Sequence, residues 1–237
     1  MKRLTTTAIC AVALLTPAVP ASAQVAELGA TQPRPAASCP DNCQAVGRVT
    51  GYQVGQGNAR NPFQVRERGK IVAFSLTLGR PRADQIDYFN DLFGGPPRAR
   101  ISVLRPGRGR RNVLSGQSEL IDLQRYFGST PTFALERPLT VKRGYLVALT
   151  VPTWAPAFGV GLANQEAWRS SRNSQSCDDV SQTAAQQRRG SQRTYGCLYR
   201  TARLLYTAFM VRNPRATSQA PDRPATPPAA QTPTPPR

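Results

Sequence analysis

Apolar residues alternate with small or polar residues over much of the chain, which is the pattern of half-buried β-strands. In one stretch Val72, Phe74, Leu76 and Leu78 are large and apolar, whereas the residues between them are small or polar. The sequence Gly-Arg-Pro that follows predicts the end of this strand.

Other segments have extended patterns of the same kind. The segments 145–151 and 204–211 are nearly continuous apolar runs, which is typical of central strands buried on both faces. Shorter patterns occur at 46–54, 100–103, 113–120 and 132–135. About seven or eight strands separated by turn residues predict a mostly β fold, a single antiparallel β-sandwich or jelly roll.

One segment has helical spacing instead. Ile86, Phe89 and Phe93 fall near one face of a helix that begins at Asp84, a residue type that caps helices. The sequence Gly-Gly-Pro-Pro at 94–97 then ends the helix. We therefore expect one short helix beside the sheets.

The start of the chain is typical of a signal peptide. Lys2 and Arg3 precede an apolar stretch over 8–19, and the small residues at 21–23 match a signal-peptidase site. The apolar stretch is too short and too interrupted by proline to span a membrane. We therefore expect residues 1–23 to be removed on export, which predicts a secreted protein that contains no membrane span.

The rest of the chain divides into three parts by composition. Residues 24–38 contain prolines and alanines without apolar periodicity, so they are expected to form a flexible linker. Residues 39–212 contain all the predicted strands and form one β-sandwich domain. Residues 213–237 are rich in Pro, Ala and Thr and predict a disordered tail, because they lack apolar side chains to offset the entropy of ordering.

The charge of the chain points to anionic partners. The formal net charge is +18, and loss of Lys2 and Arg3 with the signal peptide leaves +16. Such a charge concentrates anionic cell-wall polymers, glycans, acidic lipid surfaces and nucleic acid without selecting among them. The bias toward arginine, alanine and proline is also what GC-rich codon usage produces, and this simpler origin of the charge stays open.

Four cysteines remain after the signal peptide, namely Cys39, Cys43, Cys177 and Cys197. An even number in an exported chain predicts two disulfides, with three connectivities. The pairs closest in sequence are favoured, Cys39 with Cys43 and Cys177 with Cys197. A zinc site of all four cysteines is the alternative, but their spacing matches ribbon-type ligand pairs poorly. No metal or other cofactor is expected.

Three runs of residues carry a resemblance to a known family. GKIVAF at 69–74, RISVLRP at 100–106 and LTVKRGYLVAL at 139–149 resemble the strand signatures of exported actinobacterial jelly-roll proteins of uncharacterised function. The resemblance implies a jelly-roll order of strands. It supplies no catalytic residue.

The chain contains no histidine, which excludes Ser-His-Asp and Cys-His nucleophile systems and a His-ligated metal. Residues 194–200 resemble the Ser/Thr-His-Gly-Cys motif of L,D-transpeptidases, exported enzymes with a cysteine nucleophile. However, Tyr195 stands in the position of the motif histidine, and Cys197 has a disulfide partner in Cys177. We therefore do not expect transpeptidase activity.

Paired carboxylates can hydrolyse a glycosidic bond without histidine, so a carboxylate-based glycoside hydrolase stays open as an alternative. The sequence does not show which acids converge. Three of the candidates share a helical spacing that is typical of a solvated helix face. The candidates are Asp84, Asp87, Asp91, Glu119, Asp122, Glu136 and Glu166.

Arginines are concentrated in one connection that is expected to join two strands. Arg105, Arg108, Arg110 and Arg111 lie in a glycine-containing segment, where guanidinium forks can bind phosphate or carboxylate groups. A solvated basic turn without a ligand is the alternative.

Trp154 and Phe158 lie in a proline-containing segment near the end of a predicted strand. Rigid aromatic side chains on such a loop can stack on sugar rings or bases. The alternative is that both side chains close the end of the core, because aromatic residues bury large areas.

Taken together, these patterns predict an exported, non-catalytic module that binds an anionic polymer or glycan at the cell surface. Nucleic acid is a less favoured partner. The alternatives are the histidine-free glycoside hydrolase and a purely structural surface protein.

Overall fold

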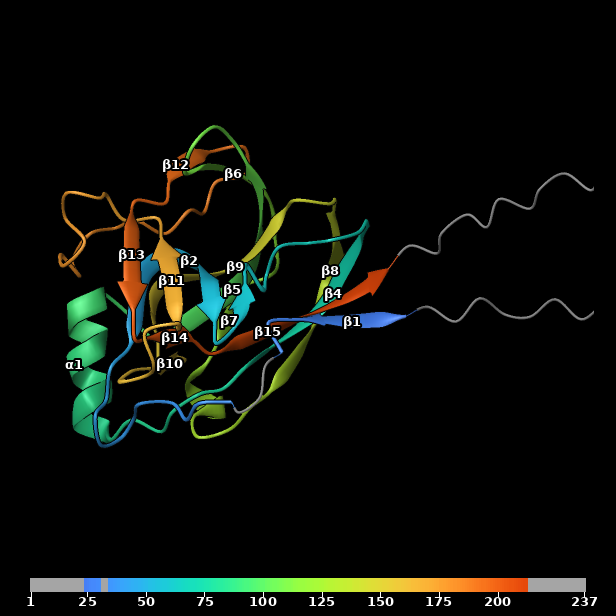
Figure 1. The fold of residues 1–237 in the computed structure, drawn as a ribbon. Coiled ribbons are helices and arrows are strands. Elements are labelled where there is room, and N and C mark those ends of the chain that lie inside the picture. Colours follow the sequence, from blue (N-terminus) through green and yellow to red (C-terminus); the bar gives the residue numbers. More distant parts are fainter. Residues whose placement is uncertain (1–23, 31–33, 213–237) are drawn as a thin grey trace, which may run out of the picture.

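The computed structural model describes residues 24–30 and 34–212, so the predicted signal peptide and tail lie outside the described residues. Within these ranges the chain is mostly β, with antiparallel sheets and one α-helix (Figure 1). The mostly β fold class is confirmed, and the sheets, which curl into a half-barrel, are consistent with a β-sandwich. The described residues form fifteen strands, more than the alternation predicts. The jelly-roll order of strands stays a prediction.

The larger sheet has the strand order β12-β6-β5-β9-β2-β11-β13, with β3 paired to β2 and β7 paired to β5. The apolar run at 145–151 lies in β9, between β5 and β2, as expected for a central strand. The strands are β2 (Val46–Gln56), β3 (Ala59–Arg60), β5 (Arg98–Pro106), β6 (Arg111–Gln117), β7 (Ile121–Asp122), β9 (Leu146–Ala155), β11 (Ala167–Ser170), β12 (Gln192–Thr194) and β13 (Cys197–Arg200).

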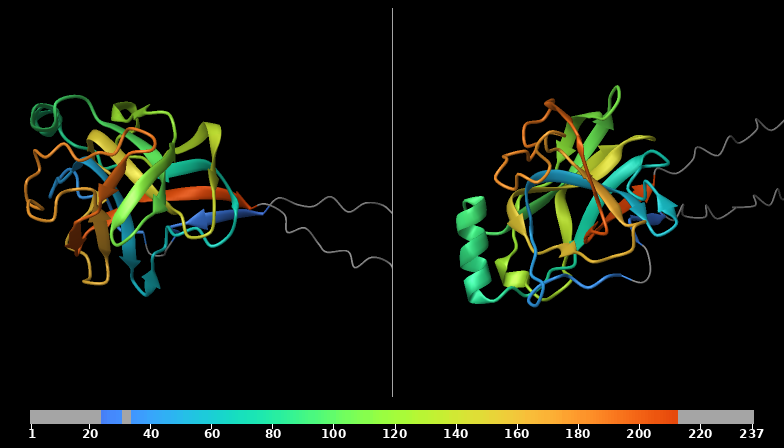
Figure 2. Two further views of the ribbon diagram at one scale, coloured as in Figure 1. Left: turned by 90° about the horizontal axis from the view of Figure 1, so that it is seen from above. Right: turned by 60° about the vertical axis from the view of Figure 1, so that its left-hand side comes forward.

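The smaller sheet has the order β1-β15-β4-β8, and β10 pairs with β14 in a separate two-stranded sheet. In this sheet β15 runs between β1 and β4 (Figure 2). The strands are β1 (Val25–Leu28), β4 (Gly69–Leu76), β8 (Thr132–Val141), β10 (Phe158–Gly159), β14 (Arg203–Leu204) and β15 (Tyr206–Arg212).

The core lies between the two sheets. Phe74 and Leu76 of β4 are fully buried in the same apolar cluster as Ile101 of β5. Phe63 stacks on Tyr206 with ring centroids 3.9 Å apart.

The predicted alternation is confirmed at Phe74 and Leu76 but not at Val72, which is only half-buried, whereas its neighbour Ile71 is 0% exposed. The pairing of β4 with β8 is irregular between Ile71 and Ala73, and such an irregularity changes which residues face the core.

The start of the fold differs from the sequence prediction. Residues 24–38 were expected to form a flexible linker, but Val25–Leu28 form β1, which pairs with β15 from Val25 to Val211. Four residues are too few to give a visible alternation, and the strand is formed because β15 offers an unpaired edge. The ordered fold thus begins before residue 39.

The predicted helix is α1 (Ala83–Phe93). Its N-cap residue is Arg82, whose backbone N–H donates to Gln85 Oε1 at 2.9 Å, so Asp84 lies in the first turn and is not the cap. The helix ends where Gly94 adopts a left-handed conformation with φ of +71°. A short 3-10 helix, η1 (Gln124–Tyr126), lies between β7 and β8.

Both predicted disulfides are present, Cys39–Cys43 and Cys177–Cys197. The second one closes a loop over a sequence separation of 20 residues.

Among the described residues, no helix has the length and apolar character needed to cross a membrane.

Candidate binding sites

The four predicted arginines lie together on the hairpin between β5 and β6. Arg105, Arg108, Arg110 and Arg111 are all exposed. The turn closes through a hydrogen bond from the Gly107 N–H to the Arg111 carbonyl at 2.8 Å. We call these four residues the arginine hairpin.

Strand β12 adds further arginines beside the arginine hairpin. It pairs with β6, with Arg193 opposite Asn112, and the Leu114 N–H donates to the Ser191 carbonyl at 3.0 Å. This pairing brings exposed Arg188, Arg189 and Arg193 to the same end of the sheet. Sequence reasoning missed these three residues, because the pairing joins segments far apart in the chain.

This basic end of the sheet lacks acidic neighbours. Residues 99–118 and 180–212 contain no aspartate or glutamate. In the described ranges, ion pairs join Arg82 to Asp84, Arg98 to Asp122 and Arg203 to Glu166, and none of these pairs involves the arginine hairpin. Among the described residues, no carboxylate therefore forms an ion pair with the arginine hairpin.

A half-buried arginine extends the positive surface from the hairpin onto β11. The Tyr195 N–H donates to the Arg110 carbonyl at 2.9 Å, and the Tyr195 ring lies 5.3 Å from the Tyr52 ring. Tyr52 in turn pairs with Arg169 across β2 and β11. Burial lowers the pKa of the Arg169 guanidinium, and the charge of Arg110 lowers it further. Arg169 Nη1 is buried and has no hydrogen-bond partner in the described structure, so this nitrogen does not face solvent.

Trp154 lies in the core and not on a loop surface. Its side chain is 0% exposed and lies 5.0 Å from the Phe89 ring of α1 and 5.7 Å from the Phe127 ring. Its Nε1–H donates to Asn90 Oδ1 at 2.9 Å. The structure therefore places Trp154 under α1 as a core residue, which is the alternative that the sequence left open.

Phe158 lies elsewhere, at a cavity of about 480 Å³ that we call the aromatic pocket. Its ring meets the Trp168 ring edge-on at 5.8 Å, and Trp168 stacks on Tyr199 at 4.6 Å. Strands β10, β11 and β13 supply these three rings. The structure thus separates Phe158 from Trp154 and joins it to two aromatic residues that sequence reasoning missed.

Arg172 lies at the wall of the aromatic pocket and is only 6% exposed. Its Nη1 donates to the Tyr199 hydroxyl at 3.1 Å, and its Nη2 donates to the Gly47 carbonyl at 3.1 Å. The Tyr199 hydroxyl donates to the Cys177 carbonyl at 2.6 Å. The disulfide at Cys177 was the signal that could have found this site, because its partner Cys197 pairs with Ser170 and aligns β11 with β13.

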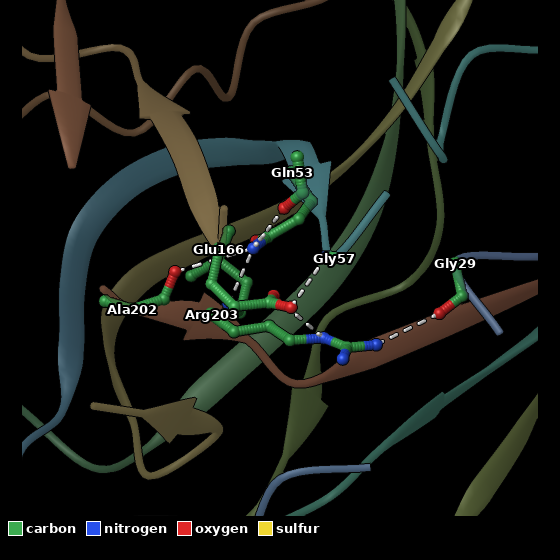
Figure 3. A network of polar contacts seen from close by, with 8 residues as sticks. Gly29, Gln53, Gly57, Glu166, Ala202 and Arg203 are labelled. Carbon is green, nitrogen blue, oxygen red and sulfur yellow. Dashed lines mark hydrogen bonds and ion pairs between the residues drawn. The ribbon is translucent and has the colours of Figure 1, made fainter. Parts of the chain in front are cut away.

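A second buried polar cluster joins three loops next to β14 (Figure 3). Arg203 Nε lies 3.9 Å from Glu166 Oε2, and Glu166 Oε1 accepts from the Gly57 N–H at 2.9 Å. Gln53 Oε1 accepts from the Leu204 N–H at 3.2 Å. These contacts tie together segments that lie far apart in the sequence.

The acidic candidates are mostly spread over the molecule. Asp84, Asp87 and Asp91 lie on α1, which is well away from β6 and β12 (Figure 1). Asp122 pairs with Arg98 at 2.6 Å. Glu119 and Glu136 are the exception, because both line one cavity of about 330 Å³ together with Ser118.

Cys197 is 0% exposed and forms a disulfide with Cys177, so it offers no thiolate for a transpeptidase reaction.

Comparison with protein-family models, curated proteins and solved structures finds no significant match to this chain in any of the three. The sites described above therefore rest on the geometry of this chain alone.

Proposed function

We propose that this protein is an exported, non-catalytic module that binds an anionic polymer or glycan at the cell surface. The observation that carries the proposal is the arginine hairpin with its neighbours on β12, a group of exposed arginines without acidic partners in the described structure. Two disulfides are compatible with function in an oxidising compartment outside the cytoplasm.

The arrangement suits a polymer better than a single ion. The exposed arginines lie along the hairpin tip and the adjacent strand β12, so several guanidinium groups can contact successive charges of one chain. Each contact releases a counterion from the polymer. The binding free energy therefore grows with the number of contacts, and the affinity falls as the salt concentration rises. The half-buried Arg169 adds its charge beside the same surface.

Retention of the protein on purified cell wall and on immobilised heparin tests the proposal. We expect the triple variant of Arg108, Arg110 and Arg111 to glutamine to elute from both matrices at clearly lower salt than the wild type, because it removes three of the exposed charges.

The matched control is the triple variant of Arg66, Arg137 and Arg143 to glutamine. These arginines are exposed in or beside the smaller sheet, and the change in net charge is identical. We expect the control to elute close to the wild type. Equal losses in the two variants would show that only net charge matters and would refute a site at the hairpin. No retention of the wild type at low salt would refute polymer binding and would favour a structural surface protein.

A glycoside hydrolase is a second candidate, favoured by the single observation that Glu119 and Glu136 line one cavity. Glu136 is exposed, however, and no aromatic ring lines this cavity to support a sugar. Release of reducing sugar from cell-wall and plant polysaccharides tests it. Turnover that is lost in both Glu119→Gln and Glu136→Gln would establish the hydrolase, and no turnover on any substrate is the result that the binding proposal expects.

A further inference from the structure

The aromatic pocket is separate from the arginine hairpin and has the size of a small-molecule site. Its volume of about 480 Å³ lies within the range of ligand pockets in proteins. Its walls come from segments that are distant in sequence, including Gln44 near the first disulfide and Cys177 of the second. A pocket assembled in this way has a fixed shape, because both of these segments are held by disulfides.

Arg172 places a buried positive charge at this pocket. Its guanidinium donates to two neutral acceptors, the Tyr199 hydroxyl and the Gly47 carbonyl. Within the described ranges no carboxylate lies within 4 Å of it, and its Nε has no hydrogen-bond partner. Hydrogen bonds from Ser181 lower the pKa of the exposed Asp179 carboxyl, and the charge of Arg172 lowers it further, so Asp179 is a counter-charge at a distance. An anion that enters the pocket and contacts the buried guanidinium directly would be stabilised more strongly.

The other walls are suited to an apolar ring. Phe158 and Tyr199 line the pocket with aromatic surface, and Val160 and Val180 add aliphatic surface. Trp168 also lines the pocket and stacks on the Tyr199 ring. Aromatic and aliphatic walls with a few polar groups are the usual composition of sites that hold small organic molecules.

A second positive charge lies at the rim. Arg200 is exposed, lines the pocket and donates to the Asn164 carbonyl at 3.5 Å through Nη1. Asp178 also lines the pocket and is exposed. Asp179 follows it in the chain and is also exposed, so both acids lie where water screens their charges.

We infer that the aromatic pocket binds a small carboxylate that carries a ring. The carboxylate accepts hydrogen bonds from Arg172, and the ring packs against Phe158 and Tyr199. This site goes beyond polymer binding, because it takes one small molecule at a place that the arginine hairpin does not share.

Isothermal titration calorimetry of the wild-type protein with 3-phenylpropionate and with its uncharged amide tests the inference. The two probes have the same ring and nearly the same shape, so they differ mainly in charge. We expect saturable binding of the carboxylate and at least about tenfold weaker binding of the amide, which is the effect of about 1.4 kcal/mol of charge-dependent interaction. Equal affinities for the two probes would overturn the role of Arg172. The absence of saturable binding for 3-phenylpropionate, phenylacetate and glucuronate alike would overturn the site.

Two variants locate the binding. Arg172→Gln should abolish the preference for the carboxylate over the amide. Because Arg172 also ties β13 to Gly47, a second variant, Val180→Trp, fills the pocket from its exposed rim, where Val180 is 43% exposed. Val25→Trp is the matched control, since Val25 is 60% exposed on β1 and away from the pocket. We expect Val180→Trp to lose binding and Val25→Trp to keep it, and equal binding by both would contradict the inference.

The same variants distinguish this site from the proposed function. Val180→Trp should leave retention on heparin unchanged, and the triple variant of Arg108, Arg110 and Arg111 should leave carboxylate binding unchanged. A loss of carboxylate binding in the hairpin variant would place the anion at the hairpin and overturn the pocket.

Discussion

Replacement of Trp154 by alanine tests the placement of this residue most sharply. The side chain is 0% exposed, and its ring lies between Phe89 of α1 and Phe127. Its Nε1–H donates to Asn90 Oδ1 at 2.9 Å. The variant therefore removes a large buried ring, the support of α1 and one hydrogen bond at the same time.

The size of the effect follows from these contacts. Truncation of a buried tryptophan to alanine costs about 3 to 5 kcal/mol, and a typical hydrogen bond contributes about 1 kcal/mol of stability. A domain has a free energy of unfolding of only about 5 to 15 kcal/mol, so this single change should remove a large share of it. For a domain of this size the Tm should fall by roughly 6 to 20 °C.

Urea unfolding followed by far-ultraviolet circular dichroism measures the loss. Asn90→Ala is the matched control, because it leaves the ring in place and removes only the acceptor of the buried Nε1–H, which should cost about 1 to 3 kcal/mol. A loss below about 1 kcal/mol for Trp154→Ala would refute its core position. If that stable variant also lost binding to glycans, Trp154 would be a stacking residue after all.

Three further changes test other parts of the fold by thermal unfolding. Joint replacement of Cys177 and Cys197 by alanine should cost about 3 kcal/mol, because the loop of 20 residues loses its constraint, and no change on reduction of the wild type would contradict this. Arg203→Met should destabilise by about 3 kcal/mol, since it leaves the Glu166 side chain, which is only 14% exposed, without its ion pair, and a neutral effect would show that this carboxylate is solvated. Gly94→Ala should cost about 1 kcal/mol, because φ is +71° there, and an unchanged Tm would argue against the left-handed helix end.

Long strands and the helix were predictable because their signal is local. The predicted strand with Phe74 and Leu76 corresponds to β4, although β4 ends at Leu76, and the apolar spacing of Phe89 and Phe93 corresponds to the buried face of α1. The turn with Arg108 and Arg110 also corresponds to a hairpin between two strands. In each case the residues that decide the structure lie within about ten positions of one another.

Short strands were not predictable in the same way. Strand β11 has four residues and one large apolar side chain, Trp168, so its sequence shows no alternation. It is formed because β2 and β13 both offer hydrogen-bonding edges, with Arg169 between Tyr52 and Leu198. Pairing of this kind depends on residues far away in the chain, and local patterns do not record it.

The two tryptophans show why the aromatic pocket was missed. Both have aromatic neighbours in the folded chain, and both are almost fully buried. Trp154 is covered by α1, whereas Trp168 lies at the wall of a cavity. The sequence does not show which tryptophan lies beside a cavity, because this depends on the three-dimensional arrangement. For the same reason the sequence does not show that Arg172 lines that cavity.

The salt dependence of polyanion affinity is the measurement that tests the central claim most directly. Fluorescence anisotropy with a labelled heparin oligosaccharide gives the Kd of the wild type between about 50 and 200 mM salt. We predict a linear fall of the logarithm of affinity with the logarithm of salt concentration. Replacement of Arg108, Arg110 and Arg111 by glutamine should reduce the slope by about one per arginine that contacts the polymer. An affinity that does not change with salt, or a slope that the triple variant leaves unaltered, would contradict binding at the arginine hairpin.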